Sequence, residues 1–260
     1  MTFPFDITIN LDQSNIAGVQ NRTIKINGGI TTFLGPNGSG KTQLLRGLKR
    51  SLNSHLNEKK IRYISAGRLG PMENFRSDYD GQRGMPRFEN ATFGDKTATS
   101  RRHQTETILG DFATLSERPD ILIKVQERLR KLFKRDIIID WDGGNLKVFF
   151  ARVDQENTSN YSSAREASGL LHLVAMLSAL YDDEVGCLLI DEPEVSLHPQ
   201  LQSFLLSEII KVAGANTEQG KKLIFISTHS TEFIELSSVE QLSCIVFCKD
   251  ILTDPVQIDP

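Results

Sequence analysis

The sequence predicts an α/β fold that has a mixed sheet core, an antiparallel β part and a helical insertion. Three observations carry this prediction. A short apolar strand at 30–34 runs into a glycine-rich loop and then into residues with helical spacing. A continuous apolar run at 185–190 is typical of a parallel strand buried on both faces. Helical and strand patterns alternate through the last third of the chain, which favours a layered α/β architecture.

The first third of the chain is predicted to consist mainly of strands that lead to this loop. Residues 5–11 and 23–26 alternate apolar and polar side chains with a period of two, as half-buried strands do. The Asn-Gly-Gly sequence at 27–29 predicts a hairpin turn between the second and third strands. After the loop, a helix is expected over 43–49 and another strand over 61–65.

The middle of the chain changes in character. From about residue 66 to residue 102, many glycines and prolines and little periodicity predict an irregular excursion. Two helices are expected between 105 and 134, with a break near 116–119. The second helix carries an apolar stripe that consists of Ile121, Val125, Leu129, Leu132 and Phe133. Residues 136–140 and 146–153 flank an Asp-Gly-Gly-Asn sequence and predict a β-hairpin.

The last third alternates between helices and strands. Helices are expected over 164–181 and 198–212, a strand over 222–226, a short helix after Ser230, and closing strands over 245–247 and 256–258. We therefore expect one domain with three parts. These are a β-rich part with the glycine-rich loop (1–66), an irregular and helical insertion (67–135), and a final part (136–260).

Composition and charge exclude several classes of protein. With 39% hydrophobic and 24% charged residues among 260, the chain is neither disordered nor fibrous. No apolar run approaches the ~20 residues of a membrane-spanning helix, and the N-terminal segment is unlike a secretory signal. Three cysteines provide no disulfide framework, so a cytoplasmic location without a membrane partner is expected. The net charge of −3 gives no overall attraction to nucleic acid but allows a local basic patch.

Residues 35–42, Gly-Pro-Asn-Gly-Ser-Gly-Lys-Thr, match G-x-x-x-x-G-K-[ST] between a strand and a helix. Glycines let backbone amides close around a polyphosphate, and the following helix adds its positive N-terminal end. Lys41 is expected to reach the β- and γ-phosphates, and the Thr42 hydroxyl to ligate Mg²⁺. The motif therefore predicts a site for a nucleotide polyphosphate and Mg²⁺, formed by Asn37, Gly38, Ser39, Gly40, Lys41 and Thr42; the resemblance described below implies that the nucleotide is ATP.

A second motif follows the buried strand at 187–190, which ends in Asp191-Glu192. Ligands of open α/β sheets bind at the carboxyl ends of the strands, where this acid pair is expected to lie. Asp191 is expected to hold the metal, and Glu192 to polarise an attacking water as general base. Alone, such an acid pair is more often a solvated strand end, but together with the phosphate loop it predicts an ATPase.

Three motifs in this order resemble those of the ABC-type ATPase domain, and specifically of the branch with OLD-family, RecF-like and SMC-like ATPases. They are the phosphate loop, Leu-Leu-Ile-Asp-Glu-Pro-Glu-Val-Ser-Leu-His-Pro at 188–199, and Ser-Thr-His-Ser-Thr-Glu-Phe-Ile at 227–234. The resemblance runs from the first strands to about Glu235 and implies a P-loop NTPase fold. It also implies that 196–199 is the D-loop and that His229 is the switch histidine that contacts the γ-phosphate. A structural histidine after a strand is the alternative interpretation of His229.

The resemblance implies two further contacts with nucleotide. Ser168-Gly169 best matches the signature motif, which caps the γ-phosphate bound by the opposite subunit, because amides at a helix N-terminus suit an anion. The usual Ser-Gly-Gly-Gln is absent, and an ordinary helix cap is the alternative. Arg68, just after the strand at 61–65, is either a γ-phosphate or interface contact or a solvated loop arginine.

The resemblance implies an ATPase that forms head-to-tail homodimers around ATP and acts as a clamp or sensor. OLD-like ATPases commonly carry a C-terminal Toprim nuclease domain, but only 31 residues follow His229 here. Any nuclease activity is therefore expected from another chain. Stand-alone ATPases of this branch resemble components of bacterial anti-phage systems that act with a nuclease or toxin partner, which is the preferred context.

Two other functions stay open. One is a DNA-binding ATPase of repair or chromosome maintenance, although the expected coiled-coil insertion is missing. The other is the nucleotide-binding subunit of a transporter, against which stand the degenerate signature and the missing glutamine after the first strands. Basic and aromatic residues of the excursion either contact DNA or a protein or form a mixed-charge surface loop; they include Arg76, Arg83, Arg87, Phe75, Tyr79 and Phe88. Cys244 and Cys248 lack a second ligand pair, so a zinc site is not expected.

Overall fold

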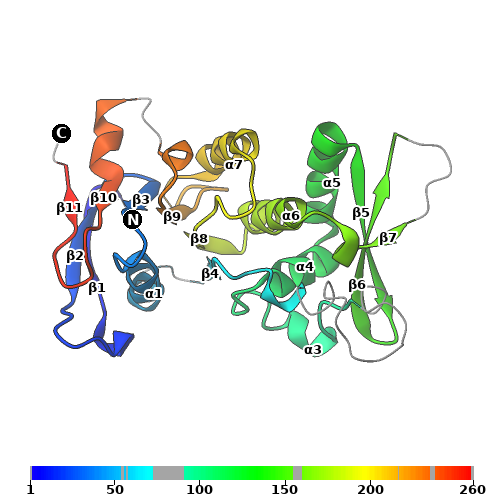
Figure 1. Ribbon diagram of the computed structural model, residues 1–260, viewed down its shortest axis with the longest axis horizontal. Helices are drawn as coiled ribbons and strands as arrows, with labels where there is room; N and C mark the ends of the chain where they lie inside the picture. Colours follow the sequence, from blue (N-terminus) through cyan, green and yellow to red (C-terminus); the bar gives the residue numbers. More distant parts are fainter. Residues whose placement is uncertain are drawn as a thin grey trace. The chain divides into compact units, whose positions relative to one another are not determined.

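A computed structural model describes residues 2–53, 56, 58–72, 91–154, 160–215, 217–234 and 238–258 (Figure 1). The chain divides into two compact units. The first consists of Met1–Ala66 and Asp183–Pro260, and the second of Gly67–Asp182. The first unit therefore contains both the phosphate loop and the acid pair, which are far apart in the sequence.

A six-stranded mixed sheet forms the centre of the first unit. Its strand order is β11 (Val256–Gln257), β10 (Ile245–Phe247), β3 (Ile30–Leu34), β9 (Leu223–Thr228), β8 (Val185–Asp191) and β4 (Lys60–Ile64). Neighbouring strands are parallel except at the β11–β10 edge. The strands predicted from the apolar runs are thus confirmed, and so is the mixed α/β sheet.

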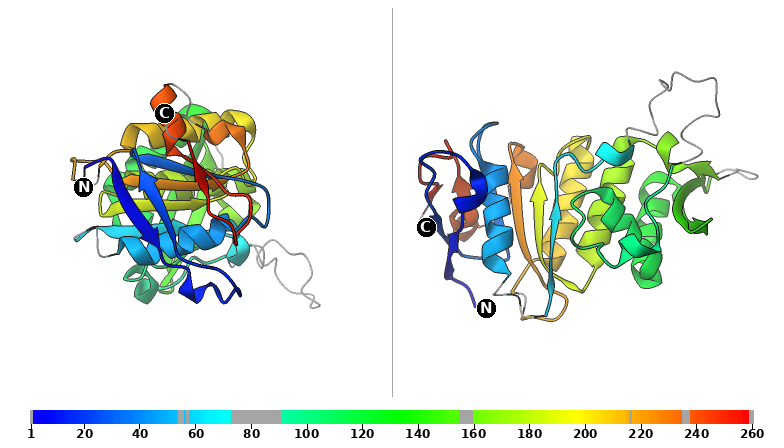
Figure 2. Two further views of the ribbon diagram at one scale, coloured as in Figure 1. Left: turned by 90° about the vertical axis from the view of Figure 1, so that its left-hand side faces the viewer. Right: turned by 90° about the horizontal axis from the view of Figure 1, so that it is seen from below.

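Two helices cover opposite faces of this sheet, α1 (Lys41–Leu52) and α7 (Pro199–Val212) (Figures 1 and 2). Every residue of β8 and β9 is buried, as expected for strands between two helical layers. In α1 the buried leucines recur at helical spacing: Leu44, Leu45, Leu48 and Leu52. Proline at the start of α7 fits a position where no backbone donor is needed, and His198 caps that helix.

The strands β1 (Phe5–Ile9) and β2 (Arg22–Ile26) form a separate antiparallel sheet of the first unit. Between them lies the short 3-10 helix η1 (Asp12–Ser14). Side chains of β2 alternate between buried and exposed, which confirms the period-two prediction. Helix α1 approaches β1 at Gly47, where an added Cβ would lie 2.4 Å from Cγ2 of Ile9.

The predicted hairpin turn at 27–29 is wrong. Strand β2 pairs with β1, whereas β3 pairs with β9 and β10 in the other sheet. Residues 27–29 instead connect the β1–β2 sheet to the six-stranded sheet. Asn27 donates a side-chain hydrogen bond to the carbonyl of Ser243 (2.9 Å), and Gly29 packs so closely that a Cβ would lie 2.3 Å from the Gly214 nitrogen. The glycine therefore serves a close backbone approach rather than a tight turn.

The second unit contains helices and an antiparallel sheet (Figure 1). Its longer elements are α4 (Ile108–Glu117), α5 (Pro119–Phe133), α6 (Ser168–Tyr181), β5 (Arg135–Asp142), β6 (Asn145–Arg152) and β7 (Tyr161–Ser162), with the short helices α3 (Lys96–Thr99) and η3 (Ser163–Arg165). The predicted break between helices is confirmed, since α5 begins at a proline. The predicted β5–β6 hairpin is also confirmed, and its two turn glycines have positive φ angles of 56° and 82°.

Two details of the second unit differ from prediction. Helix α6 begins at Ser168 rather than at 164, because residues 163–165 form a 3-10 turn in which the Ser162 hydroxyl accepts from the Ala164 amide. The apolar stripe of α5 is shorter than predicted, since Leu132, in the last turn of the helix, is 42% exposed. Arg76, Arg83, Arg87 and the aromatic residues among them lie outside the described residues.

Candidate functional site

The phosphate loop connects the carboxyl end of β3 to the first turn of α1. Its glycines adopt backbone conformations that other residues rarely adopt, with φ of 81° at Gly38 and 88° at Gly40. Lys41 folds back over this loop, and its Nζ donates hydrogen bonds to the carbonyls of Gly35 (2.8 Å) and Pro36 (2.9 Å). The lysine is only 5% exposed, so its positive charge lies inside the loop that the sequence predicts to hold phosphates.

Asp191, the last residue of β8, is held by hydroxyl groups. Its carboxylate accepts hydrogen bonds from Thr42 Oγ1 (2.9 Å), from Tyr63 Oη (3.1 Å) and from Ser227 Oγ. The residue is 3% exposed. A buried carboxylate beside the threonine hydroxyl is the hard oxygen donor set that Mg²⁺ prefers, so both residues fit the predicted metal role.

Glu192 of the acid pair and residues of the phosphate loop line one cavity of about 300 Å³ in the first unit. Of the predicted site residues, the cavity is lined by Asn37, Gly38, Gly40, Lys41, Thr42 and Glu192. Ser39 does not line it and is 2% exposed. Ile16 and Ile251 complete the apolar part of the lining. The structure therefore brings together residues that the sequence predicts to bind phosphate and the glutamate that it predicts to activate water.

Glu192 has an unusual backbone conformation, with φ of 49° in the left-handed region. Its amide donates a hydrogen bond to the carbonyl of Ser227 (2.9 Å), which ties the residue to the neighbouring strand β9. Residues other than glycine in this region cost roughly 1–3 kcal/mol, and such strain concentrates at functional sites. This conformation directs the chain away from β8 just where the side chain reaches the cavity.

His229 follows β9 and is 50% exposed at its side chain. Its Nδ1 lies 3.3 Å from Oε1 of Glu194. Among the described residues, His229 is not part of the lining of the 300 Å³ cavity. The structure thus places it beside the acid-pair loop, at the same carboxyl edge of the sheet as the end of β3.

The remaining predicted residues belong to the second unit. Ser168 and Gly169 are the first two residues of α6, are partly exposed, and follow Ala167, which provides no side-chain cap. Arg68 is fully buried, and its backbone carbonyl accepts a hydrogen bond from the Ile108 amide (3.1 Å). Its burial does not fit the interpretation as a solvated loop arginine.

Sequence reasoning missed three groups around the acid pair: Tyr63, Ser227 and Glu194. Ser227 lies opposite Asp191 in the β8–β9 pairing, and Tyr63 lies on β4, which pairs with the other edge of β8. Ser227 and Glu194 stand inside motifs that the sequence does reveal. Their roles depend on which strands are neighbours, and no local pattern gives that order.

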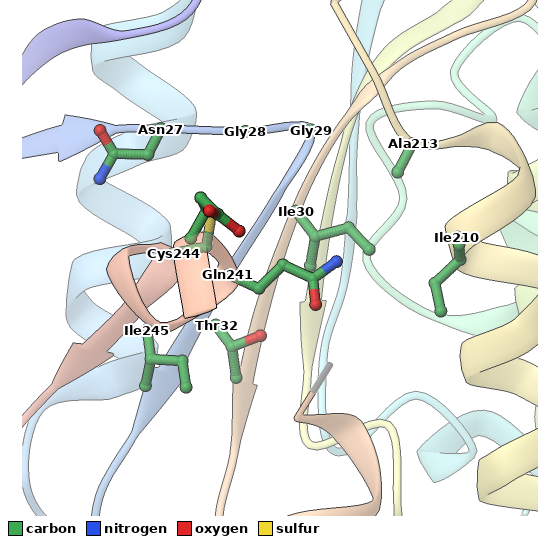
Figure 3. A pocket seen from close by; sticks show the side chains of 11 residues that line it. Asn27, Gly28, Gly29, Ile30, Thr32, Ile210, Ala213, Gln241, Cys244 and Ile245 are labelled. Atoms are coloured by element: carbon green, nitrogen blue, oxygen red, sulfur yellow. The ribbon is translucent and has the colours of Figure 1, made fainter. Parts of the chain in front are cut away.

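A second cavity, of about 280 Å³, lies at the start of β3, at the opposite end of that strand from the phosphate loop (Figure 3). Ile30, Ile210 and Cys244 supply part of its lining, with η5 (Val239–Cys244) along one side. None of the predicted site residues lines it. The cavity therefore gives no support to the predicted chemistry.

The described part of the chain contains neither a membrane span nor a cluster of metal-ligating side chains. No helix there has the length and apolar character needed to cross a membrane. No group of three or more histidine, cysteine, aspartate and glutamate side chains there is arranged to hold a metal ion. None of the three cysteines forms a disulfide. Within these residues, the pairing of Thr42 with Asp191 stands as the candidate metal site.

Solved structures with the same fold include the head of an SMC protein bound to the C-terminal winged-helix domain of ScpA. The two chains are 12% identical, with a TM-score of 0.54 over 99% of this chain and 98% of the other. A dimeric bacterial ABC transporter cassette matches at 15% identity and a TM-score of 0.43, covering 95% of this chain and 94% of that one. An ATP-binding subunit of an ABC transporter matches at 15% identity and a TM-score of 0.48, covering 95% and 85%. No curated protein matches the chain.

A family model described as "AAA domain, putative AbiEii toxin, Type IV TA system" matches residues 86–235. This match covers more than half of the chain and includes the acid pair, the D-loop segment and His229. The phosphate loop lies before the matched range. It connects β3 to α1 in the first unit, which also contains the acid pair. The chain belongs to this AAA domain family, and its fold is that of an ABC-type P-loop ATPase domain.

Proposed function

We propose that this chain binds and hydrolyses ATP and acts as an ATP-dependent dimerising clamp or sensor. One observation carries the proposal: Lys41, Thr42 and Glu192 line one cavity, and Asp191 is hydrogen-bonded to Thr42 beside it. These groups come from two segments about 150 residues apart, which the parallel sheet brings to one edge. Their types are those needed to bind a triphosphate and to activate water.

Each residue has a proposed role. Backbone amides of Asn37, Gly38, Ser39 and Gly40 surround the phosphates, and the Lys41 ammonium neutralises phosphate oxygens. Thr42 and Asp191 would hold Mg²⁺, which supplies positive charge to the β- and γ-phosphate oxygens when bound. Glu192 accepts a proton from the attacking water, and His229 contacts the γ-phosphate.

We further propose that the whole chain, 1–260, acts as one ATPase domain and that ATP joins two copies head to tail. Ser168 and Gly169 support this, because they are the partly exposed first residues of α6, and the N-terminus of a helix suits a phosphate held by the other copy. The dimer is then closed in the ATP-bound state and opens after hydrolysis. ATP turnover would time this clamp.

The biological role that we propose is bacterial anti-phage defence with a nuclease or toxin partner. The family description names a toxin of a type IV toxin–antitoxin system, which supports a role that involves a second component. The SMC head of similar fold is seen bound to a domain of another protein, ScpA, which also supports a protein partner. Nuclease activity, where it is involved, would come from that partner.

Nucleotide binding, turnover and size distribution test this proposal together. Wild-type protein should bind ATP with Mg²⁺ in calorimetry and release phosphate. Lys41→Ala should bind ATP at least about tenfold more weakly, since it removes the charge that faces the phosphates. Glu192→Gln should bind ATP normally, lose about a hundredfold or more in turnover and accumulate as a nucleotide-bound dimer.

Two outcomes would contradict the proposal. Unchanged turnover in both variants would remove Lys41 and Glu192 from the site, and failure of the folded wild-type protein to bind ATP would remove the site itself. Adding DNA to the turnover assay separates the functions: strong stimulation by DNA would favour the repair or chromosome-maintenance ATPase instead. Co-purification with a membrane permease would favour the transporter subunit.

A further inference from the structure

Glu194 lies in the loop after β8, two residues beyond Glu192, and contacts the segment that follows β9. Its Oε1 accepts hydrogen bonds from the Thr228 hydroxyl (2.7 Å) and from the His229 backbone amide (3.0 Å). The same oxygen lies 3.3 Å from Nδ1 of the His229 ring. One carboxylate oxygen therefore contacts the backbone and side chain of the candidate switch histidine and the residue before it.

The contacts continue from Glu194 into α7. The Thr228 hydroxyl accepts a hydrogen bond from the Ser230 amide (2.9 Å), and the Ser230 hydroxyl donates to Oε1 of Gln202 on α7 (2.9 Å). Gln202 in turn donates from Nε2 to the carbonyl of Leu197 in the D-loop segment (2.8 Å). The acid-pair loop, the segment 228–230 and the start of α7 are thus one hydrogen-bonded network within the first unit.

Burial of the Glu194 carboxylate is unfavourable for the free energy of folding. Its side chain is 8% exposed. Within the described part of the chain, its Oε2 is buried and has no hydrogen-bond partner. A buried, half-satisfied carboxylate is expensive, and a residue that served packing alone would be better replaced by an apolar or neutral side chain. The negative charge therefore needs an explanation other than stability.

We propose that Glu194 is a positioning residue that sets the orientation and tautomer of the His229 imidazole. This inference deepens the proposed function and rests on it for the link to turnover. Because Nδ1 lies 3.3 Å from a carboxylate oxygen, the tautomer with its hydrogen on Nδ1 is the favoured one, as in other sites where a carboxylate orients a histidine. Nε2, at the opposite end of the ring, is then the nitrogen left to meet a ligand. Rotation of the ring would break the Nδ1 contact.

The backbone contact gives Glu194 a second effect. The segment 228–230 is anchored through the Thr228 hydroxyl and the His229 amide, so a shift of the acid-pair loop moves the histidine with it. Glu192 lies two residues earlier in the same loop. Glu194 thereby couples the position of the candidate base to the position of the candidate γ-phosphate contact.

The first test measures the ring directly and needs no turnover. Protein labelled with ¹⁵N-histidine has five histidines, and His229→Gln identifies the signal of the residue concerned. In the wild type we expect the His229 signals of an Nδ1–H tautomer, and in Glu194→Ala we expect that preference to be lost. The same tautomer in both proteins would overturn the proposal, whatever the protein does with ATP.

The second test measures catalysis and includes a matched control. Glu194→Ala should lower kcat by roughly tenfold to a hundredfold, as loss of groups that orient a catalytic residue does, and change KM for ATP by less than about threefold. Glu194→Gln keeps an acceptor oxygen and should recover much of this loss. Glu208 on α7 is also a buried glutamate, 2% exposed and paired with Lys211, so Glu208→Gln should leave kcat unchanged.

A double-mutant cycle decides whether Glu194 acts through His229. In a His229→Ala background, Glu194→Ala should cause a much smaller loss of kcat than in the wild type, because the ring that it orients is gone and only the backbone contacts remain. Independent, multiplying losses would overturn the proposal, and so would equal losses in Glu194→Ala and Glu208→Gln. A wild-type protein without ATPase activity would instead refute the proposed function, and the tautomer measurement would still decide the role of Glu194.

Discussion

Replacing Gly40 by alanine is the sharpest test of the phosphate loop, because Gly38 provides a matched control. Both glycines have similar φ angles, 88° at Gly40 and 81° at Gly38. A Cβ at Gly40 would lie 2.7 Å from Cβ of Ile251 and 2.9 Å from its Cγ1 and Cδ1. A Cβ at Gly38 would meet nothing within 4 Å. The two substitutions therefore share the backbone strain and differ in crowding.

The expected destabilisation follows from these two contributions. Holding alanine in the left-handed region costs roughly 1–2 kcal/mol, and the stiffer unfolded chain returns about 0.4–1 kcal/mol of this. Gly38→Ala should therefore lower the free energy of unfolding by about 0–1.6 kcal/mol. Overpacking a side chain typically costs about 1–3 kcal/mol more, so Gly40→Ala should lower it by about 1–4.6 kcal/mol, which is about 1–3 kcal/mol more than Gly38→Ala.

Urea unfolding followed by circular dichroism measures this difference, and calorimetry measures ATP affinity. Gly40→Ala should also weaken ATP binding more than Gly38→Ala does, since the loop must shift away from Ile251. The double variant Gly40→Ala with Ile251→Ala should recover part of the stability, because it removes the two contacts at 2.9 Å and leaves the one at 2.7 Å. Equal unfolding free energies for the two single variants would refute this reasoning.

Ionisable side chains give two further predictions. Burial raises the pKa of the Cys187 thiol well above its usual range and the pKa of the Cys248 thiol to about 12. At pH 8 a thiol reagent should therefore modify Cys244 first, and equal rates of modification at all three cysteines would contradict this. Because unfolded thiols titrate near pH 8.5 and these folded ones do not, the free energy of unfolding should fall as pH rises above about 8.5, and Cys187→Ala should reduce that fall in urea titrations. Burial, and then the hydrogen bond to Glu166, raises the pKa of Tyr161 to about 12. Tyr161→Phe removes this hydrogen bond and should lower the free energy of unfolding by about 1 kcal/mol; an unchanged free energy of unfolding would contradict this.

Much of the fold can be predicted from the sequence because its signals are local. The phosphate loop needs only a strand, a run of glycines and a helix in order, and the structure has β3, positive φ angles and α1 in those places. The apolar run at 185–190 likewise gives a strand that is buried throughout. Turn glycines at 143 and 144 predict the β5–β6 hairpin because their conformations suit that turn and few others.

Where the outcome depends on distant segments, the sequence predicts less. Asn27-Gly28-Gly29 carries the same local signal as the hairpin at 143–144, yet β3 pairs with strands that come about 200 residues later. The roles of Tyr63 and Ser227 likewise follow from the order β4, β8 and β9 in the sheet. The start of α6 is also predicted incorrectly. The Ser162 cap produces a 3-10 turn in a segment whose composition favours an α-helix.

The pairing of β8 with β9 links the proposed metal residue to the proposed positioning residue. In this register Asp191 lies opposite Ser227. The next two residues along the chain, Thr228 and His229, donate hydrogen bonds to Glu194. A slip by one residue would turn every side chain of β9 to the other face and would break the contacts of both carboxylates together. Since all residues of both strands are buried, such a slip would also exchange the side chains that pack on the two faces of the sheet and disturb the packing of both. The pairing and packing of β8 and β9 therefore position both the acid pair and His229. Because the sheet already sets these positions, few additional hydrogen bonds are needed to orient the two.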